Sequence, residues 1–335
     1  MNRVFIPLNL PQPDPVPADA VVDSLSGLTM GTSWSVRLIR PAGCDLKTMQ
    51  DGIQRQLDLV VAQMSTWSSD SDLSRYNHAA ADSWQVLPEH FLKVLDCALA
   101  VAELSGGAYD PSVGPLVNLW GFGPDPKRSE RPDDVAIARE RQRCGWQRIR
   151  IDRARHALLQ PGDLYLDFSS IAKGYGVDLV AAYLRSVGAV SYLVEVGGEL
   201  YGQGVKADGQ PWWAGMEHPP AAAGADEHVQ SIAALHGVAL ATSGDYRRYF
   251  DDGERRYSHT IDPRTAQPVA HALASVAVLH ADCMTADAWA TALMVLGDEE
   301  GLALALSNGV AALFISRDGE GFRERLTPAM QAMLG

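Results

Sequence analysis

The sequence predicts an α+β fold, in which mixed or antiparallel sheets pack against helices. Two observations lead to this prediction. Strand-like and helix-like segments are mixed along the chain without the regular strand–helix–strand repeat of a doubly wound sheet. No GxGxxG or GxxxxGK[ST] motif stands between a strand and a helix, so the common nucleotide-binding folds are not indicated.

Size and charge narrow the class of protein further. The chain has 335 residues, 47% of them hydrophobic, which is enough for one large domain or two closely packed lobes. Its net charge of −13 repels nucleic acid and anionic membranes, so we expect neither as a partner. No apolar run reaches the length of a transmembrane helix. A phosphate-bearing ligand would therefore need a local source of positive charge, such as a metal ion or the N-terminal end of a helix.

The chain divides into an extended, Pro-rich N-terminal segment at 1–20 and a single domain at 21–335. The first residues hold one Arg and a short apolar patch that prolines interrupt, without the apolar core of a signal peptide or a lipid-acceptor Cys. We therefore expect a cytoplasmic protein, or a periplasmic one if a leader has been removed. The four cysteines are widely spaced and lack a CxxC pair, which is typical of buried thiols. The sequence gives no indication of oligomeric state.

Hydrophobic periodicity predicts the individual elements in order. Two strands joined by a turn at Met30-Gly31-Thr32 come first, and helices and further strands follow. The expected helices cover 45–64, 88–104, 135–144, 171–187, 283–296 and 299–307. The expected strands cover 21–29, 33–39, 147–152, 164–168, 191–196, 231–242, 257–261, 275–280 and 311–316. Segments 121–135 and 218–228 are expected to be surface loops, and 242–245 and 251–253 tight turns.

The helix at 283–296, CMTADAWATALMVL, is apolar except for a few positions. Asp287 and Thr291 lie four residues apart and therefore project from one face. A carboxylate in such a helix is costly unless a partner such as a hard cation compensates its charge. Taken alone, the pair is better explained by an Asp in the first helical turn and a Thr bonded to its own backbone. The segments described next favour the metal site.

The segment 166–178, LDFSSIAKGYGVD, predicts a strand end followed by a helix start. Asp167 ends the strand, Ser169 and Ser170 stand where the helix begins, and Lys173 lies in its first turn. Free amides and the positive end of the helix dipole suit a phosphate. A lysine is unfavourable at this end, and an anionic ligand would explain it. The alternative is a Ser cap with a solvated Lys.

Three other segments carry candidate ligand contacts. The Gly-rich segment 105–123 can let backbone amides approach a flat ligand, although Asp110 could instead cap its turn. Its Trp120 and Phe122 are interpreted as core aromatics. In the polar segment 64–77, Trp67 could stack on a ring or lie in a solvated loop. His259, at a strand end among small polar residues, could be a general base, although a lone His is more often structural.

Taken in order, seven segments of the chain resemble the FAD:protein FMN transferase family, often called ApbE. They span about residues 28–297, and such an ordered set is far more specific than any one motif. The segments are Met30-Gly31-Thr32, MSTWSSDSDLSRYN at 64–77, GGAYDPSVGPLVNLWGFG at 106–123, LDFSSIAKGYGVD at 166–178, YLVEVGGEL at 192–200, ATSGDYRRYF at 241–250 with YSHTIDPRT at 257–265, and TADAWATAL at 285–293. The resemblance implies an ApbE-like, T-fold-like architecture.

The resemblance also implies an activity and a set of site residues. Members bind FAD, use Mg2+, split the pyrophosphate and attach FMN through a phosphoester to a Thr or Ser of a target flavoprotein, with release of AMP. Asp287 and Thr291 match metal ligands, and Ser170 matches a third metal contact through its hydroxyl or its carbonyl. His259 matches the base that activates the acceptor hydroxyl. The positions that match FAD contacts are Met30, Trp67, Ala108, Tyr109, Asp110, Asp167, Lys173 and Ile261.

Two rival functions fit much of the same pattern. An FAD pyrophosphatase would use the same site with water as the acceptor, and the sequence does not separate hydrolysis from transfer. A non-catalytic FAD-binding protein would need the ring contacts but not Asp287, Thr291 and His259. All three are present, which argues against the binding protein.

Overall fold

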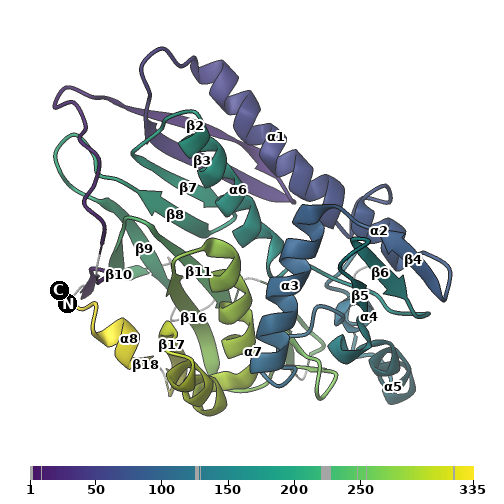
Figure 1. Ribbon diagram of the computed structural model, residues 1–335. Helices are drawn as coiled ribbons and strands as arrows, with labels where there is room; N and C mark the ends of the chain where they lie inside the picture. The colour runs from purple at the N-terminus through teal and green to yellow at the C-terminus, as the bar shows by residue number, and fades with distance from the viewer. Residues whose placement is uncertain are drawn as a thin grey trace.

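The computed structural model describes residues 3–8, 10–124, 128, 130–219, 228–246, 248–253, 255–319 and 321–335. Its centre is an antiparallel sheet of eight strands in the order β18-β17-β16-β11-β8-β7-β3-β2 (Figure 1). These strands are β2 (Val22–Thr29), β3 (Thr32–Ile39), β7 (Tyr192–Val196), β8 (Glu199–Gln203), β11 (Val238–Gly244), β16 (Leu273–His280), β17 (Ala311–Asp318) and β18 (Gly321–Leu326). The predicted α+β class with antiparallel sheets is confirmed.

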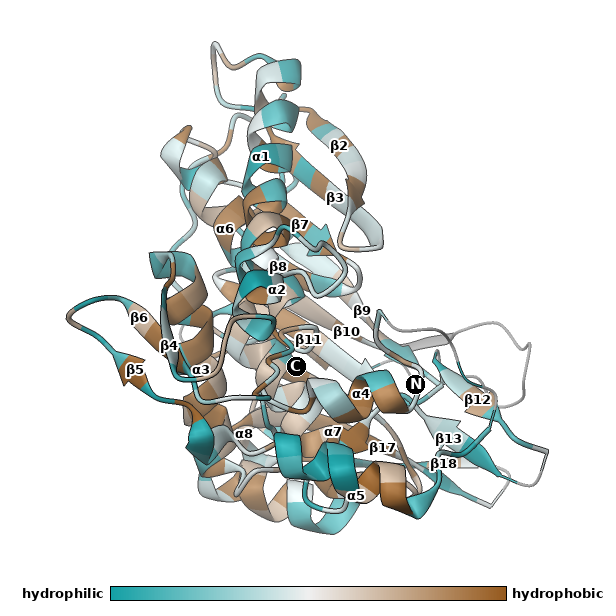
Figure 2. Ribbon diagram, turned by 90° about the vertical axis from the view of Figure 1, so that its right-hand side faces the viewer, coloured by the Kyte–Doolittle hydropathy of each residue, from teal (hydrophilic) through white to brown (hydrophobic). Residues whose placement is uncertain are grey.

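Helices cover one face of this sheet. Helix α1 (Leu46–Met64) and helix α6 (Ala172–Ser186) lie over the β2, β3, β7 and β8 half, and helix α7 (Cys283–Ser307) lies over β11, β16 and β17 (Figure 1). Helix α3 (Glu89–Leu104) packs on the outer side of α7. The first half of α7, residues 283–295, is enclosed from several sides and mostly apolar (Figure 2), so its polar residues must find partners inside the protein.

The opposite face of the sheet is also covered. A second sheet in the order β1-β10-β9 packs there, made of β1 (Arg3–Phe5), β9 (Trp212–His218) and β10 (His228–Leu235), together with helix α8 (Pro328–Gln331). Strand β16 is buried along almost its whole length because it has a layer on both faces, which explains its continuous apolar run. The two ends of the chain lie side by side, since Phe5 and Leu334 form a bridge (Figure 1).

A smaller part of the molecule lies beyond the central layers, near α3 (Figure 1). It contains a sheet in the order β4-β6-β5 and several short helices, while two hairpins, β12–β13 and β14–β15, pack against α4 and α5, and Figure 2 shows β12–β13 on the side away from β4-β6-β5. These elements are α2 (Asp72–Asn77), β4 (Ser83–Val86), α4 (Gly114–Leu119), α5 (Asp134–Arg143), β5 (Ile151–Asp152), β6 (Ala157–Gln160), β12 (Tyr249–Asp251), β13 (Arg256–Ser258), β14 (Ile261–Asp262) and β15 (Gln267–Pro268). Within the described residues, no helix is long and apolar enough to cross a membrane.

Most predicted elements are present, and several expectations are wrong. Segment 164–168 is not a strand, because the Asn77 side chain takes the place of a partner strand and bonds both the N–H and the carbonyl of Leu166. Segment 231–242 divides into β10 and the start of β11, and β11 continues to Gly244 where a tight turn was expected. The two predicted late helices, in contrast, are both present as the two halves of α7, because Gly297 between them has non-helical backbone angles.

Three further expectations have mixed outcomes. Residues 3–5 of the N-terminal segment form β1, while 7–20 has no regular helix or strand where it is described. Of the four cysteines, which are all free, Cys283 is buried and the other three are only partly buried. The predicted loop at 218–228 lies outside the described residues from 220 to 227, and its ends belong to β9 and β10. Trp120 is buried in a core cluster, as predicted, and Phe122 packs against that cluster.

Candidate active site

The starts of helices α6 and α7 cap each other. The carboxylate of Asp287 on α7 accepts a hydrogen bond from the Gly174 N–H in the first turn of α6, at 3.0 Å. In return, Asp178 on α6 accepts from the N–H groups of Cys283 and Met284, the first residues of α7, at 2.8 and 2.9 Å. Helix starts leave such N–H groups without partners, and a carboxylate is their best acceptor. This arrangement, the reciprocal cap, fixes the two helix starts against each other.

Glycine makes this close approach possible. A Cβ atom at Gly174 would lie 2.4 Å from the carbonyl oxygen of Cys283 and 2.9 Å from the Cβ of Asp287. Any larger residue would therefore push α7 away from α6. This contact therefore requires glycine at position 174, the first residue of the Gly-Tyr-Gly sequence that follows Lys173.

Asp287 is a buried carboxylate with spare bonding capacity. Its residue is 4% exposed, and among the described residues only its Oδ2 receives a hydrogen bond, from Gly174. Burial raises the pKa of Asp287, while the charge of Lys173 opposes that shift. A carboxylate with one oxygen unused and an environment that disfavours its charge is suited to a cation.

Two hydroxyl residues accompany Asp287 as predicted metal contacts. Thr291 lies one turn after Asp287, and its hydroxyl is 3.3 Å from that of Ser243 on β11. Ser170 precedes α6, and its hydroxyl donates to the Tyr109 hydroxyl at 3.2 Å. No three His, Cys, Asp or Glu side chains cluster as metal ligands in the described part of the chain. Mg2+ commonly takes one or two carboxylates and completes its shell with phosphate and water oxygens, so one carboxylate and hydroxyls suffice.

Lys173 forms an ion pair with Glu199, the first residue of β8. Glu199 is 2% exposed, and its second oxygen, Oε2, is buried without a hydrogen-bond partner in the described residues. Although burial lowers it, the charges of Glu199 and Asp287 raise the pKa of Lys173, so this lysine remains a cation. The charge of Lys173 also acts on His259. Lys173 therefore interacts electrostatically with both Asp287 and His259.

His259 is set up as a neutral base. Its Nδ1 lies 3.1 Å from the carbonyl oxygen of Arg248. Because a carbonyl only accepts hydrogen bonds, the proton of the neutral ring is on Nδ1 and the lone pair is on Nε2. Burial lowers the pKa of His259 to about 4, and the charges of Arg248 and Lys173 act in the same direction. At neutral pH this imidazole therefore has a nitrogen ready to accept a proton.

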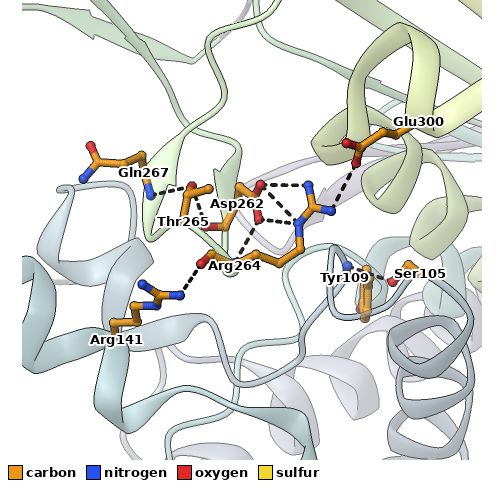
Figure 3. A network of polar contacts seen from close by, with 8 residues as sticks. All are labelled: Ser105, Tyr109, Arg141, Asp262, Arg264, Thr265, Gln267 and Glu300. Atoms are coloured by element: carbon orange, nitrogen blue, oxygen red, sulfur yellow. Dashed lines mark hydrogen bonds and ion pairs between the residues drawn. The ribbon is translucent and has the colours of Figure 1, made fainter.

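Three ion pairs hold the segments on either side of His259. Asp245, after β11, forms a double hydrogen bond with Arg317 on β17, at 2.6 and 2.8 Å. In the β14–β15 hairpin, Asp262 binds Arg264, which also reaches Glu300 on the second half of α7 at 3.2 Å (Figure 3). The hairpin next to His259 is thus tied to the same helix that carries Asp287.

The predicted FAD contacts are found in different environments. Met30 has a positive φ of 47° in the β2–β3 turn, and its Cε would lie 3.0 Å from a Cβ at Gly176, so its side chain reaches α6. Ala108 and Tyr109 are buried, and the Tyr109 N–H donates to Ser105 (Figure 3). The Tyr109 hydroxyl rather than its ring faces Ser170.

Among the remaining predicted contacts, two carboxylates are occupied by protein partners, while Ile261 and Trp67 differ in burial. The Asp110 carboxylate accepts from the N–H groups of Ser112 and Trp146, which is the turn-capping role that was the alternative for it. Asp167 is buried and accepts from the Ser169 N–H at 2.7 Å. Ile261 is buried on β14, while the side chain of Trp67 is 67% exposed.

Two residues near the site were not singled out from the sequence. Glu199 follows Gly197-Gly198, and an acidic residue directly after a Gly-Gly turn that ends a buried strand was the available signal. Ser243 lies next to Thr291 in the folded protein, but no local sequence pattern predicts that contact. Both depend on chain segments that meet only in the folded protein.

Comparisons with known proteins agree on one family. The sequence model of the ApbE family matches residues 30–314. The chain is 42% identical over 319 residues to an FAD:protein FMN transferase of Vibrio cholerae, covering 95% of this chain and 94% of that protein. It is 35% identical over 330 residues to the FAD:protein FMN transferase of Escherichia coli K12, covering 96% and 92%.

Solved structures have the same fold. The flavinyl transferase ApbE of Pseudomonas stutzeri, in its apo form, aligns with a TM-score of 0.86 at 40% identity, covering 94% of this chain and 98% of that one. An ApbE protein of Thermotoga maritima aligns with a TM-score of 0.84 at 26% identity, covering 94% and 100%. The family match, the relatives and these structures lead to one conclusion: the chain belongs to the ApbE family.

Proposed function

We propose that this chain is an FAD:protein FMN transferase that works with Mg2+. A Thr or Ser hydroxyl of a target flavoprotein attacks the phosphorus on the FMN side of the FAD pyrophosphate. The bond from that phosphorus to the bridging oxygen breaks, FMN remains on the protein through a phosphoester, and AMP leaves. The names of the relatives support this reaction for a chain so similar over its full length.

One observation carries the proposal beyond family membership. The Lys173 ammonium interacts electrostatically both with the neutral imidazole of His259, whose Nδ1 is held by the Arg248 carbonyl, and with the buried carboxylate of Asp287. Phosphoryl-type transfer requires charge neutralisation and positioning more than covalent help, and these three groups supply both.

Each group has a role in this proposal. His259 accepts the proton of the attacking hydroxyl at Nε2. Lys173 stays paired with Glu199 beside Asp287, and with a metal ion at Asp287 it would add to the positive charge that faces the phosphates. Asp287, Thr291 and Ser170 would hold Mg2+, which when bound neutralises charge on the pyrophosphate. The predicted FAD contacts, from Met30 to Ile261, would position the two rings.

The experiment is a mass measurement on a candidate acceptor flavoprotein. The acceptor is incubated with this chain, FAD and Mg2+, and in parallel with EDTA. We expect a mass gain equal to FMN only with Mg2+, together with one AMP released per modified acceptor. Free FMN and AMP without a protein adduct would instead identify a pyrophosphatase. FAD that is bound but stays whole would identify a binding protein.

The acceptor needs a matched control. A variant of the acceptor with Ala at the modified Thr or Ser should gain no mass, since it lacks the attacking oxygen. An adduct on that variant would contradict the phosphoester chemistry proposed here.

A further inference from the structure

Lys173 does not present a free positive charge to a ligand. Its ammonium is paired with Glu199, which is 2% exposed and has no other hydrogen-bond partner among the described residues. The charges that act on Glu199 are those of Lys173 and Asp287. These three residues, the charge cluster, hold two carboxylates and one ammonium and therefore have a net charge of −1 when all are ionised.

The backbone holds this pair firmly. Gly197, with a φ of +59°, forms the turn between β7 and β8, and a Cβ there would lie 3.3 Å from the Cδ of Lys173 and 2.8 Å from the Thr32 side chain. The turn thus packs on the lysine stem, and Glu199 follows it directly. Because Glu199 is buried, movement of the Lys173 ammonium away from it and toward a ligand would leave a buried carboxylate without a compensating charge. The lysine is therefore retained by Glu199 whenever a phosphate approaches.

The negative net charge of the charge cluster disfavours binding of an anionic ligand. A dinucleotide pyrophosphate has a charge of about −2, so a cluster of net charge −1 repels it. A divalent cation at Asp287 reverses the sign of the cluster. We infer that Glu199 is a specificity-determining residue that makes binding of the FAD pyrophosphate conditional on the metal, because it cancels the charge of Lys173. This inference rests on the proposed function and deepens it.

The test compares FAD affinity with and without metal in the whole chain. FAD fluorescence gives the Kd in Mg2+ and in EDTA at about pH 8, since burial raises the pKa of Glu199 to about 7 and the residue should be ionised. The quantity of interest is the ratio of the two Kd values. In Glu199→Gln we expect FAD binding in EDTA to become about tenfold tighter, so that the ratio falls about tenfold. Glu199→Asp, which keeps the charge, should keep the wild-type ratio.

A matched control and a charge-free ligand separate this effect from a structural one. Glu195→Gln lies on the adjacent strand β7, where Glu195 accepts from the Ser35 hydroxyl at 3.0 Å, and it should not change the ratio. Riboflavin has no phosphate, so its affinity should not respond to the metal or to Glu199→Gln. A purely structural Glu199 would weaken FAD and riboflavin binding equally in both buffers.

Folding of the variant is the remaining concern. The side chain of Lys173 is 30% exposed, so water can solvate its ammonium when Glu199 is replaced. Glu199→Met, without polar atoms, is a second neutral variant with the same expected fall in the ratio. An unchanged ratio in folded neutral variants, or loss of folding in both, would overturn the inference. Failure of the wild-type chain to bind FAD even with Mg2+ would instead refute the proposed function.

Discussion

Gly174→Ala tests whether the reciprocal cap holds the site together. The new Cβ would lie 2.4 Å from the Cys283 carbonyl oxygen, whereas carbon–oxygen contacts of this kind need about 3.3 Å. The helix starts must therefore separate by roughly 0.9 Å, a shift that lengthens the 3.0 Å bond from Gly174 to Asp287 beyond hydrogen-bond range.

The magnitude follows from three contributions. Loss of a hydrogen bond to a charged group costs about 2 kcal/mol, and strain in the packed helix contact costs about 1–3 kcal/mol. Ala gains about 1 kcal/mol over Gly in helix propensity. The net loss is about 2–4 kcal/mol, which in a chain of this size lowers the melting temperature by roughly 5 °C.

The assay pairs thermal unfolding with the transfer reaction. A matched control is Gly176→Ala, two residues along α6, where the new Cβ meets the ends of the Met30 and Leu57 side chains at 3.0 and 3.2 Å rather than backbone. Flexible side-chain ends can move, so this variant should melt close to wild type. We expect Gly174→Ala to lose most of its transfer activity as well, because Asp287 and Lys173 shift together. A Gly174→Ala protein that melts at or above the wild-type temperature would falsify the reciprocal cap as a constraint.

Three further predictions concern the site directly. Asp287→Asn keeps an oxygen for the Gly174 N–H but removes the charge, so transfer measured by acceptor mass should fall at least about 100-fold with little change in melting temperature; a wild-type rate with metal present would refute the metal assignment. His259→Asn should slow transfer about 100-fold or more while the Kd for FAD stays within about threefold; a large loss of FAD affinity at an unchanged rate would count against a base. Because folding lowers the pKa of His259 to about 4, the unfolded chain binds this proton more readily, so the free energy of unfolding should fall as the pH drops from about 6.5 to 4; this part of the pH dependence should be absent in His259→Asn, as urea unfolding at several pH values can measure.

Elements with strong local signals could be predicted from the sequence. Helix α1 begins after Asp45, whose side chain accepts from the Thr48 N–H, and its periodicity continues to Met64. The β2–β3 hairpin was found because alternation on both sides of Met30-Gly31 fixes a turn there. In such elements the residues that specify the structure are close together in the chain.

Features that depend on distant partners could not be predicted. Segment 164–168 has a strand-like sequence, but its hydrogen bonds are satisfied by the side chain of Asn77, almost ninety residues earlier. The role of Gly174 as the contact point of two helices requires knowing that α6 and α7 cross at their starts. The same holds for Glu199, since only the fold brings β8 against Lys173.

For the candidate site, the sequence identified the participating segments better than their contacts. Asp287 and Lys173 were chosen together and interact electrostatically in the structure. Their immediate hydrogen-bond partners, Gly174 and Glu199, were not foreseen. The metal and base assignments remain predictions that the Asp287 and His259 variants test, and the FAD contacts remain predictions.

The reciprocal cap also has a consequence for how the chain can change over evolutionary time. Helix α6 covers one half of the central sheet and α7 the other, and their starts are joined by hydrogen bonds from Asp287 and Asp178. The Asp287 carboxylate, which is proposed to bind the metal, thus also connects the two halves of the protein. A lineage that abandoned the reaction would still benefit from a hydrogen-bond acceptor at this position, which Asn supplies as well as Asp, so persistence of a polar residue there is not by itself a sign of retained activity.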